Sequence, residues 1–208
     1  MHIGAYIFVV VISYFLGATP SGYLVGRACG IDVRAFGSGN IGATNVVRVL
    51  GRNAGAAVLA ADALKGFVAA RCAPLWALLV FPSSGAGREN LALAGGVAAI
   101  LGHIYTCWLH FKGGKGIATS GGVVLAWVPA AALTAVATWG VVLALSRYVS
   151  LASIVAAIVL PFAVWLWKGS ATMTGVMTAL SLLAIYKHKA NIQRLRHGTE
   201  NRVGMKKT

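Results

Sequence analysis

Long apolar runs constrain what this chain can fold into more than any other feature of its sequence. A helix needs roughly 20 apolar residues to cross a bilayer. The runs cover residues 3–26, 54–82, 91–111, 121–146, 151–167 and 171–186. Hydrophobic residues make up 58% of the 208 and charged residues only 11%, which excludes an ordinary soluble domain. The sequence therefore predicts an all-α, polytopic integral membrane protein built as one domain, residues 1–208.

The cationic segments between the runs predict how the chain is oriented, because lysines and arginines collect on the cytoplasmic side. The loop of residues 27–52 holds four arginines and one acid, and the tail from Lys187 holds seven lysines and arginines. We therefore expect the N-terminus outside and the C-terminus in the cytoplasm, which needs an odd number of crossings. Either 151–167 or 171–186 is then a partial span, or the run interrupted at Arg71–Pro74 contains an extra pass.

The first polar stretch, residues 36–48, reads FGSGNIGATNVVR. Its glycines let the backbone turn tightly and approach a ligand closely. Its polar side chains supply directional hydrogen bonds, and a guanidinium is well suited to phosphate. These side chains are Ser38, Asn40, Thr44, Asn45 and Arg48. The alternative is a polar turn between two membrane helices, although a turn alone needs only two or three such residues.

The second polar stretch, residues 112–120, contains Lys115 within a glycine-rich loop that opens a helix. Such a loop offers backbone amides and the helix dipole to an anion, although its spacing is not that of a Walker A motif. The alternative is an interfacial lysine that reaches toward the lipid headgroups. Because the second stretch is predicted on the same membrane face as the first, we expect both to contribute to one site.

The third polar stretch, residues 187–202, is the cationic tail and is predicted on that same face. At helical spacing, His188, Asn191 and Arg194 share one side. They would present an imidazole, an amide and a guanidinium to one substrate. The alternative, equally weighted, is a basic tail that touches lipid headgroups. Glu200, the only acid of the tail, is expected to form a salt bridge that pins it.

Asp62 and Lys65 lie three residues apart inside an apolar run. Ionisable residues inside a membrane helix are costly and indicate function by default. The equally weighted alternative is that the two residues form a mutual ion pair. His103, in another apolar run, is expected to be a hydrogen-bonded packing residue and not a base.

Several kinds of chemistry are excluded by what the chain lacks. It has only four carboxylates, and its three cysteines show no metal-ligand spacing, so no metal site and no cofactor are expected. No histidine is followed five residues later by aspartate, and no nucleophile elbow or Cys–His pair is present. The lysines and arginines behind the net charge of +14 lie between the membrane runs. They therefore indicate topology, lipid binding or an anionic substrate, and a nucleic-acid partner is not expected.

Four blocks, in order and spread over nearly the whole chain, resemble the acyl-phosphate:glycerol-3-phosphate acyltransferases of bacterial membranes, the PlsY family. The blocks are GSGNIGATN at 37–45, DALKG at 62–66, Gly102-His103 leading into FKGGKGIAT at 111–119, and HKANI at 188–192 leading to Gly198-Thr199-Glu200. The main departure is at residues 104–107, where the family usually has an aromatic residue followed by proline.

The resemblance implies about seven transmembrane helices, here five long and two short or partial. It implies a multi-pass protein of the bacterial cytoplasmic (inner) membrane whose active site faces the cytoplasm. It also implies acyl transfer from acyl phosphate to the sn-1 hydroxyl of glycerol 3-phosphate, the first step of phospholipid synthesis. The expected partners are glycerol 3-phosphate, a long-chain acyl phosphate and membrane lipid, and the expected state is a monomer.

Carried onto this chain, the resemblance implies a role for each block. His188, Asn191 and Lys115 are expected to be catalytic, and Asp62, Lys65 and Glu200 structural. The substrate-binding set is Ser38, Gly39, Asn40, Thr44, Asn45, Arg48, Gly113, Gly114, Gly116 and Thr119. The transfer should be direct, without a covalent intermediate, and the base is either His188 or, as we favour, the donor's own phosphate.

Two alternatives to an acyltransferase, from other functional classes of membrane protein, remain. One is a membrane transporter of phosphate or a phosphorylated small molecule, since glycine-rich loops and buried ions at a helix break also occur there. A transporter should carry its polar residues at mid-membrane, whereas here they collect at one face. The other is a lipid-binding scaffold, which would not need a lysine cradled by glycines.

Overall fold

The computed structural model describes residues 2–204, and every regular element in that range is helical. The elements are α1 (His2–Ala18), α2 (Ser21–Ala28), η1 (Val33–Ala35), α3 (Ala43–Leu50), α4 (Arg52–Val80), α5 (Arg88–Ile104), η2 (Cys107–Leu109), α6 (Ile117–Trp127), α7 (Pro129–Ser146), α8 (Val149–Lys168), α9 (Ala171–Lys187) and α10 (Lys189–Arg196). The all-α prediction is confirmed. Lys206 and Lys207, which the cytoplasmic-tail prediction counts, lie outside the described residues.

Five segments are long and apolar enough to cross a membrane by length and composition. They are His2–Ala28, Arg52–Val80, Arg88–Leu109, Pro129–Ser146 and Val149–Lys168. The apolar helices α6 and α9 are shorter, with 11 and 17 residues. At 1.5 Å per residue, α6 rises only about 16 Å, roughly half the hydrocarbon thickness. The membrane character predicted from composition is confirmed, while the number of crossings and the orientation of the termini stay predictions.

The helix boundaries follow the proline and glycine signals of the sequence. Thr19 and Pro20 form a full break between α1 and α2. The run at 54–82 is one continuous helix, α4, with Pro74 inside it, so it contains no extra pass.

The expectation of one helix over 121–146 is wrong, because the run is divided between α6 and α7. Pro129 begins α7, and a proline disfavours helical backbone at the residue before it. Val128 accordingly has φ −142° and ψ 80°, which ends α6.

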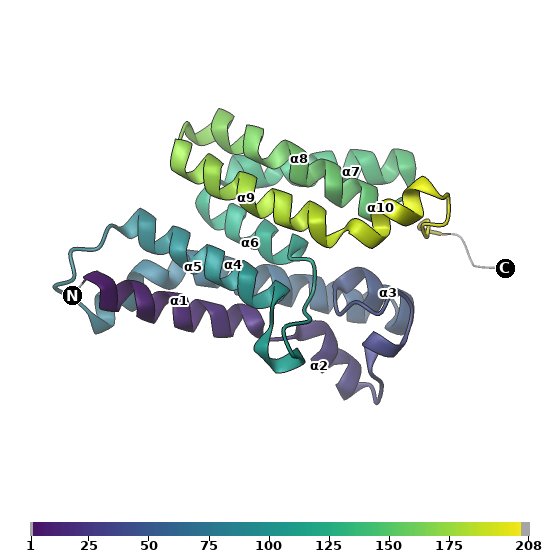
Figure 1. Cartoon of the computed structure of the whole chain (residues 1–208), viewed down its shortest axis with the longest axis horizontal. Coiled ribbons are helices and arrows are strands. Elements are labelled where there is room, and N and C mark those ends of the chain that lie inside the picture. The colour runs from purple at the N-terminus through teal and green to yellow at the C-terminus, as the bar shows by residue number, and fades with distance from the viewer. Residues whose placement is uncertain (1, 205–208) are drawn as a thin grey trace. The chain divides into compact units, whose positions relative to one another are not determined.

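The chain divides into two compact units, the first ending at Trp127 and the second beginning at Val128. In the first unit, α1, α4 and α5 lie side by side, α6 packs along α4, and the short α3 packs on α4 (Figure 1). Glycines bring these backbones together. An added Cβ at Gly17 or Gly102 would overlap backbone atoms across the α1–α5 contact, and one at Gly66 or Gly122 would overlap backbone atoms across the α4–α6 contact.

In the second unit, α8 packs against α7 and α9, and the short α10 contacts α8 and α9. Two tryptophans fasten α7 to α8: the Trp139 indole donates to Ser153 Oγ (3.2 Å), and the Trp167 indole donates to Thr134 Oγ1 (3.1 Å). The chain after α10 returns to the α7–α8 turn, where the Val203 amide donates to the Arg147 carbonyl (2.8 Å).

Candidate active site

The first polar stretch folds as a tight turn followed by α3, and Asn45 holds the turn together from inside. Its Oδ1 accepts from the Ser38 amide (2.7 Å), and its Nδ2 donates to the carbonyls of Val33 (2.9 Å) and Phe36 (3.2 Å). Asn45 is only 1% exposed. Gly37 has φ +60°, and a Cβ there would overlap Asn45 Oδ1. The Asn45 amide group is therefore occupied by the loop itself.

The other polar residues of this stretch divide into those that shape the turn and those at its surface. Asn40 Oδ1 accepts from the Gly42 amide (2.8 Å), and Gly39 has φ +69°, so both shape the turn. Ser38 and Arg48 are exposed, and Thr44 is half-buried in the first turn of α3. Ser38 of the turn and Arg48 of α3 thus place a hydroxyl and a guanidinium at the surface, the groups that a phosphate site uses.

An apolar cluster joins this turn to the segment that leads into the second polar stretch. Val33, Ile41, Val46 and Val58 are packed with Leu109 of η2, and all five are buried. The first stretch and the chain just ahead of the second are thereby held together in the first unit. This supports the expectation that the two stretches are neighbours.

The glycine loop, residues 112–116 of the second stretch, is bound to the end of α5. The amides of Gly113 and Gly114 donate to the carbonyls of Ile104 and His103, both at 3.1 Å. Gly116 takes φ +84° and leads directly into α6. Lys115 lies half-buried between these fixed points. The amides of Gly113 and Gly114 are thus occupied by α5, whereas the start of α6 is in the arrangement that binds anions at helix N-termini.

Thr119 lies in the first turn of α6 and is fully buried. Its carbonyl is where a Cβ added to Gly66 of α4 would collide. Its Oγ1 has no hydrogen-bond partner within the described part of the chain. The threonine therefore faces α4, and its predicted role in substrate binding stays a prediction.

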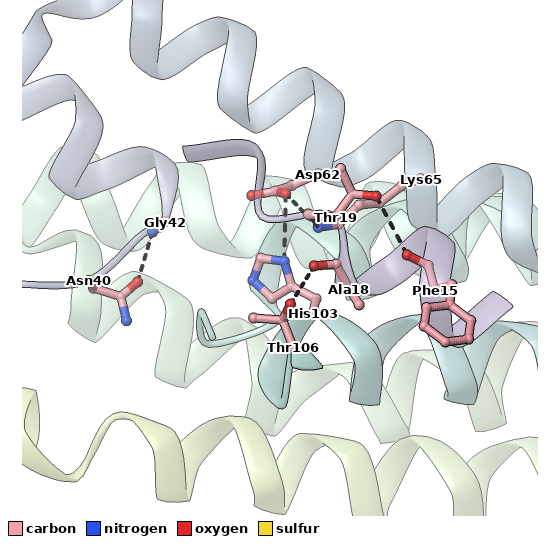
Figure 2. A network of polar contacts seen from close by, with 9 residues as sticks. All are labelled: Phe15, Ala18, Thr19, Asn40, Gly42, Asp62, Lys65, His103 and Thr106. Carbon is pink, nitrogen blue, oxygen red and sulfur yellow. Dashed lines mark hydrogen bonds and ion pairs between the residues drawn. The ribbon is translucent and has the colours of Figure 1, made fainter. Parts of the chain in front are cut away.

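Asp62, Lys65 and His103 form a buried cluster beneath these loops (Figure 2). Asp62 Oδ1 lies 2.9 Å from Lys65 Nζ and 3.5 Å from His103 Nδ1. Lys65 Nζ also donates to the Thr19 carbonyl (2.7 Å) in the break between α1 and α2. The mutual ion pair considered for Asp62 and Lys65 is present. The sequence pattern did not indicate His103 as its third member, because α5 brings it there from 41 positions away.

In the second unit, Glu200 is the centre of the third polar stretch. Glu200 Oε1 accepts from Asn191 Nδ2 (2.8 Å) and Ser150 Oγ (2.9 Å), and Oε2 accepts from Arg194 Nε (2.7 Å). Burial opposes ionisation, but these hydrogen bonds and the Arg194 charge outweigh it and lower the pKa of Glu200. The salt bridge expected of Glu200 is present, and Ser150 of α8 is a partner that no sequence signal indicated.

His188 occupies the junction of α9 and α10 and is 3% exposed. Its Nδ1 lies 2.8 Å from the Ala184 carbonyl oxygen. A carbonyl only accepts, so Nδ1 carries the hydrogen in this contact, and a neutral His188 has Nε2 as its acceptor nitrogen. The ring is thus held in the tautomer that can accept a proton or hydrogen bond at Nε2.

Two further features of the described residues bear on the site. A cavity of about 360 Å³ in the first unit is lined by residues such as Arg71, Arg88 and Trp127, and none of the predicted site residues lines it. Within residues 2–204, no three His, Cys, Asp or Glu side chains are grouped so that they could hold a metal ion.

Comparison with known proteins gives one consistent result. Residues 7–198 match the family described as glycerol-3-phosphate acyltransferase. A protein of that name from Geobacter sulfurreducens is 46% identical over 191 residues, covering 92% of this chain and 94% of its own. One from Desulforudis audaxviator is 47% identical over 208 residues, covering 98% of each chain.

Two solved structures resemble the whole fold. They are crystal structures of PlsY, an integral membrane glycerol 3-phosphate acyltransferase. The glycerol 3-phosphate form has a TM-score of 0.84 and 38% identity, covering 96% of each chain. The lysophosphatidic acid form has a TM-score of 0.82 and 37% identity, covering 96% of this chain and 95% of that one.

Proposed function

Because the chain belongs to the glycerol-3-phosphate acyltransferase family, we propose that it transfers a long-chain fatty acyl group from acyl phosphate to the sn-1 hydroxyl of glycerol 3-phosphate. The products are lysophosphatidic acid and inorganic phosphate. Residues 1–208 act as one acyltransferase domain in the bacterial cytoplasmic membrane, with the site on the cytoplasmic side. This transfer is the first step of bacterial phospholipid synthesis.

The glycine loop is the main structural support for the proposed function. Both substrates contain phosphate, and the loop combines Lys115 with the start of α6, where the first amides of a helix can bind an anion. Ser38 and Arg48, both exposed in the first polar stretch, supply a second set of phosphate-binding groups. Two phosphate sites suit a reaction between two phosphorylated substrates. We assign the glycine loop to the donor, and Ser38 and Arg48 to glycerol 3-phosphate.

The reaction needs no covalent intermediate, because an acyl phosphate is already activated. The sn-1 oxygen attacks the carbonyl carbon of the donor and forms a tetrahedral oxyanion. The C–O bond to phosphate then breaks, and phosphate leaves with the proton of the sn-1 hydroxyl. The protein contributes orientation and a positive environment for the oxyanion, in which Lys115 is the cation we assign.

His188 and Asn191 are assigned to the acceptor hydroxyl. With Nδ1 bonded to the Ala184 carbonyl, a neutral His188 carries its acceptor lone pair on Nε2, and we assign this atom to the sn-1 hydroxyl. Asn191 is oriented by its bond to Glu200. We favour the donor phosphate as the final proton acceptor, since the chain contains so few bases, and His188 then aligns the hydroxyl.

The decisive experiment is single-turnover phosphate release from the purified protein in lipid. Palmitoyl phosphate is supplied with and without glycerol 3-phosphate, and palmitoyl-CoA serves as the negative control. The proposal expects release only when both substrates are present, together with formation of lysophosphatidic acid. Saturable uptake of glycerol 3-phosphate into vesicles, without phosphate release, would instead support the transporter.

The proton acceptor is tested by His188→Gln, which keeps a hydrogen-bonding group but removes the base. If the donor phosphate takes the proton, the variant keeps near-normal turnover, because alignment is retained. If His188 is the base, turnover falls by about 10²–10⁴-fold while both substrates still bind. Measuring turnover beside glycerol 3-phosphate binding separates the two results.

A further inference from the structure

The cavity of the first unit lies between three helices, at the ends of α5 and α6 that are away from the glycine loop. Arg71 comes from α4, Arg88 is the first residue of α5, and Trp127 is the last residue of α6. The glycine loop follows the other end of α5 and leads into the other end of α6. The volume of about 360 Å³ is within the range of pockets that hold small ligands. The proposed acyl transfer makes no use of this cavity.

Two arginines of the cavity lie in membrane-spanning segments. Arg71 is inside the segment Arg52–Val80, and Arg88 begins the segment Arg88–Leu109. An ionisable side chain within such a segment is costly and indicates function by default. Within residues 2–204, neither guanidinium forms an ion pair or a hydrogen bond with another residue. In the predicted orientation both arginines are near the outer face, where the preference of cations for the cytoplasmic side does not explain them.

The charges around the cavity favour an anion. Glu89, in the first turn of α5, also lines it, so two guanidiniums are set against one carboxylate. The start of α5 adds the positive end of a helix dipole, and its N-cap, Gly87, supplies no side-chain hydrogen bond.

Trp127 adds a hydrogen-bond donor with a fixed position. Its indole nitrogen is buried and has no hydrogen-bond partner among the described residues. The ring is held in place, because a Cβ on Gly96 would overlap its edge. Arg88, Ala92 and Gly96 recur every four residues, so the ring and Arg88 share one side of α5. An indole N–H only donates, and a phosphate oxygen in the cavity would supply the acceptor that it lacks.

The cavity also has an apolar side, formed by α4. Leu75 and Leu78 line it and are 53% and 49% exposed. Inorganic phosphate would leave these leucines uncovered. A phospholipid would place an acyl chain along them while its phosphate reaches the arginines, so the lining suits a ligand that is anionic at one end and apolar at the other.

We propose that this cavity binds an anionic phospholipid. The phosphate lies between Arg71 and Arg88, the Trp127 indole donates to a phosphate oxygen, and an acyl chain follows Leu75 and Leu78. The long Arg71 side chain reaches from within the membrane toward the headgroup. In the predicted orientation this lipid belongs to the outer leaflet, at the opposite face from the proposed active site. The inference concerns binding alone and does not rest on the proposed function.

The test is native mass spectrometry of the purified full chain in a neutral detergent, titrated with phosphatidylglycerol. Phosphatidylcholine, which has no net charge, and inorganic phosphate are the comparison ligands. The variants are Arg71→Gln, Arg88→Gln and Trp127→Phe. Arg52→Gln is the matched control, because Arg52 is an exposed arginine at the start of α4 and does not line the cavity. The unfolding midpoint of each protein is measured with and without lipid.

Arg71→Gln and Arg88→Gln should each raise the Kd for phosphatidylglycerol by about tenfold or more, since each removes a hydrogen bond to a charged group. Trp127→Phe removes a single N–H donor and should raise it by about three- to tenfold. Arg52→Gln should leave it within about twofold, because an exposed charge contributes little. Arg88→Gln should keep the lipid-free midpoint of the wild type and lose the increase that phosphatidylglycerol gives. Phosphatidylcholine should bind more weakly, and inorganic phosphate should not compete.

An unchanged Kd in Arg88→Gln would overturn the inference, as would an equal weakening by Arg52→Gln, which would show unspecific attraction to a cationic surface. Equal binding of the two lipids would overturn it as well. Competition by inorganic phosphate at the same concentration as the lipid would assign the cavity to a free anion and reject the phospholipid. If Arg71→Gln does not fold, Arg88→Gln decides the test, because Arg88 is exposed at the start of its helix.

Discussion

At the scale of single residues, the sequence identifies the polar positions but not the direction in which each side chain points. Ser38 and Arg48 are at the surface, as a ligand site requires, whereas Asn45 of the same stretch is turned inward. Nothing in the linear pattern separates the two kinds. The approach of His103 to Asp62 could not be predicted either, because it depends on how α4 packs on α5.

Glu200 gives a testable prediction at this scale. Its three hydrogen bonds fasten the tail to α8 and α10, so Glu200→Gln should lower stability at neutral pH by about 1–3 kcal/mol. The unfolding midpoint of the purified protein measures this. Glu89→Gln, at an exposed position on α5, is the matched control and should change the midpoint less.

Glu200 also predicts how the stability of the protein depends on pH. The folded protein holds the pKa of Glu200 below its ordinary value of 4.5, so its stabilising contribution is complete above that pH. The contribution is lost as the pH falls through the lower, folded-state pKa. An acid titration of the unfolding midpoint should therefore be shallower in Glu200→Gln than in wild type. Parallel curves would contradict the assignment.

At the scale of helices, boundaries marked by proline, glycine or charge were predictable, but reading the run 121–146 by its apolar composition overlooked Pro129 within it. The break at Thr19–Pro20 and the turn at residues 168–170 follow such signals. The run 121–146 is equally apolar on both sides of Val128, so its composition gave no reason to divide it. Pro129 divides the run, because it disfavours helical backbone at Val128.

Two neighbouring glycines of α6 give a matched pair of substitutions. A Cβ at Gly122 would overlap the Ala63 carbonyl of α4, while nothing lies within 4 Å of a Cβ at Gly121. Gly122→Ala should destabilise by about 1–3 kcal/mol through overpacking. Gly121→Ala should be neutral or stabilising by up to about 1 kcal/mol, because glycine is a poor helix former. The unfolding midpoints of the two variants are compared. Equal effects would contradict the close contact between Gly122 and the Ala63 carbonyl.

At the scale of the whole molecule, composition was enough to predict a helical membrane protein, and the charge distribution predicts its orientation. Cys29 offers a direct test, because it is exposed and lies in the loop predicted to be cytoplasmic. With Cys72 and Cys107 replaced by alanine, a membrane-impermeant maleimide should label Cys29 only after the cells are permeabilised. Ser83→Cys is the control, because it lies between the runs 54–82 and 91–111, one crossing beyond that loop and therefore outside, and it should be labelled in intact cells. The reverse pattern would invert the topology.

The glycine contacts of the first unit also limit how it can move. Where α1 meets α5, and where α4 meets α6, backbone lies directly on backbone with no side chain between them. Sliding either pair by one residue, about 1.5 Å, would bring Cβ atoms of neighbouring residues into those carbonyl groups. Shear between these helices is therefore blocked. These helix pairs therefore form a rigid frame for the loops that they carry.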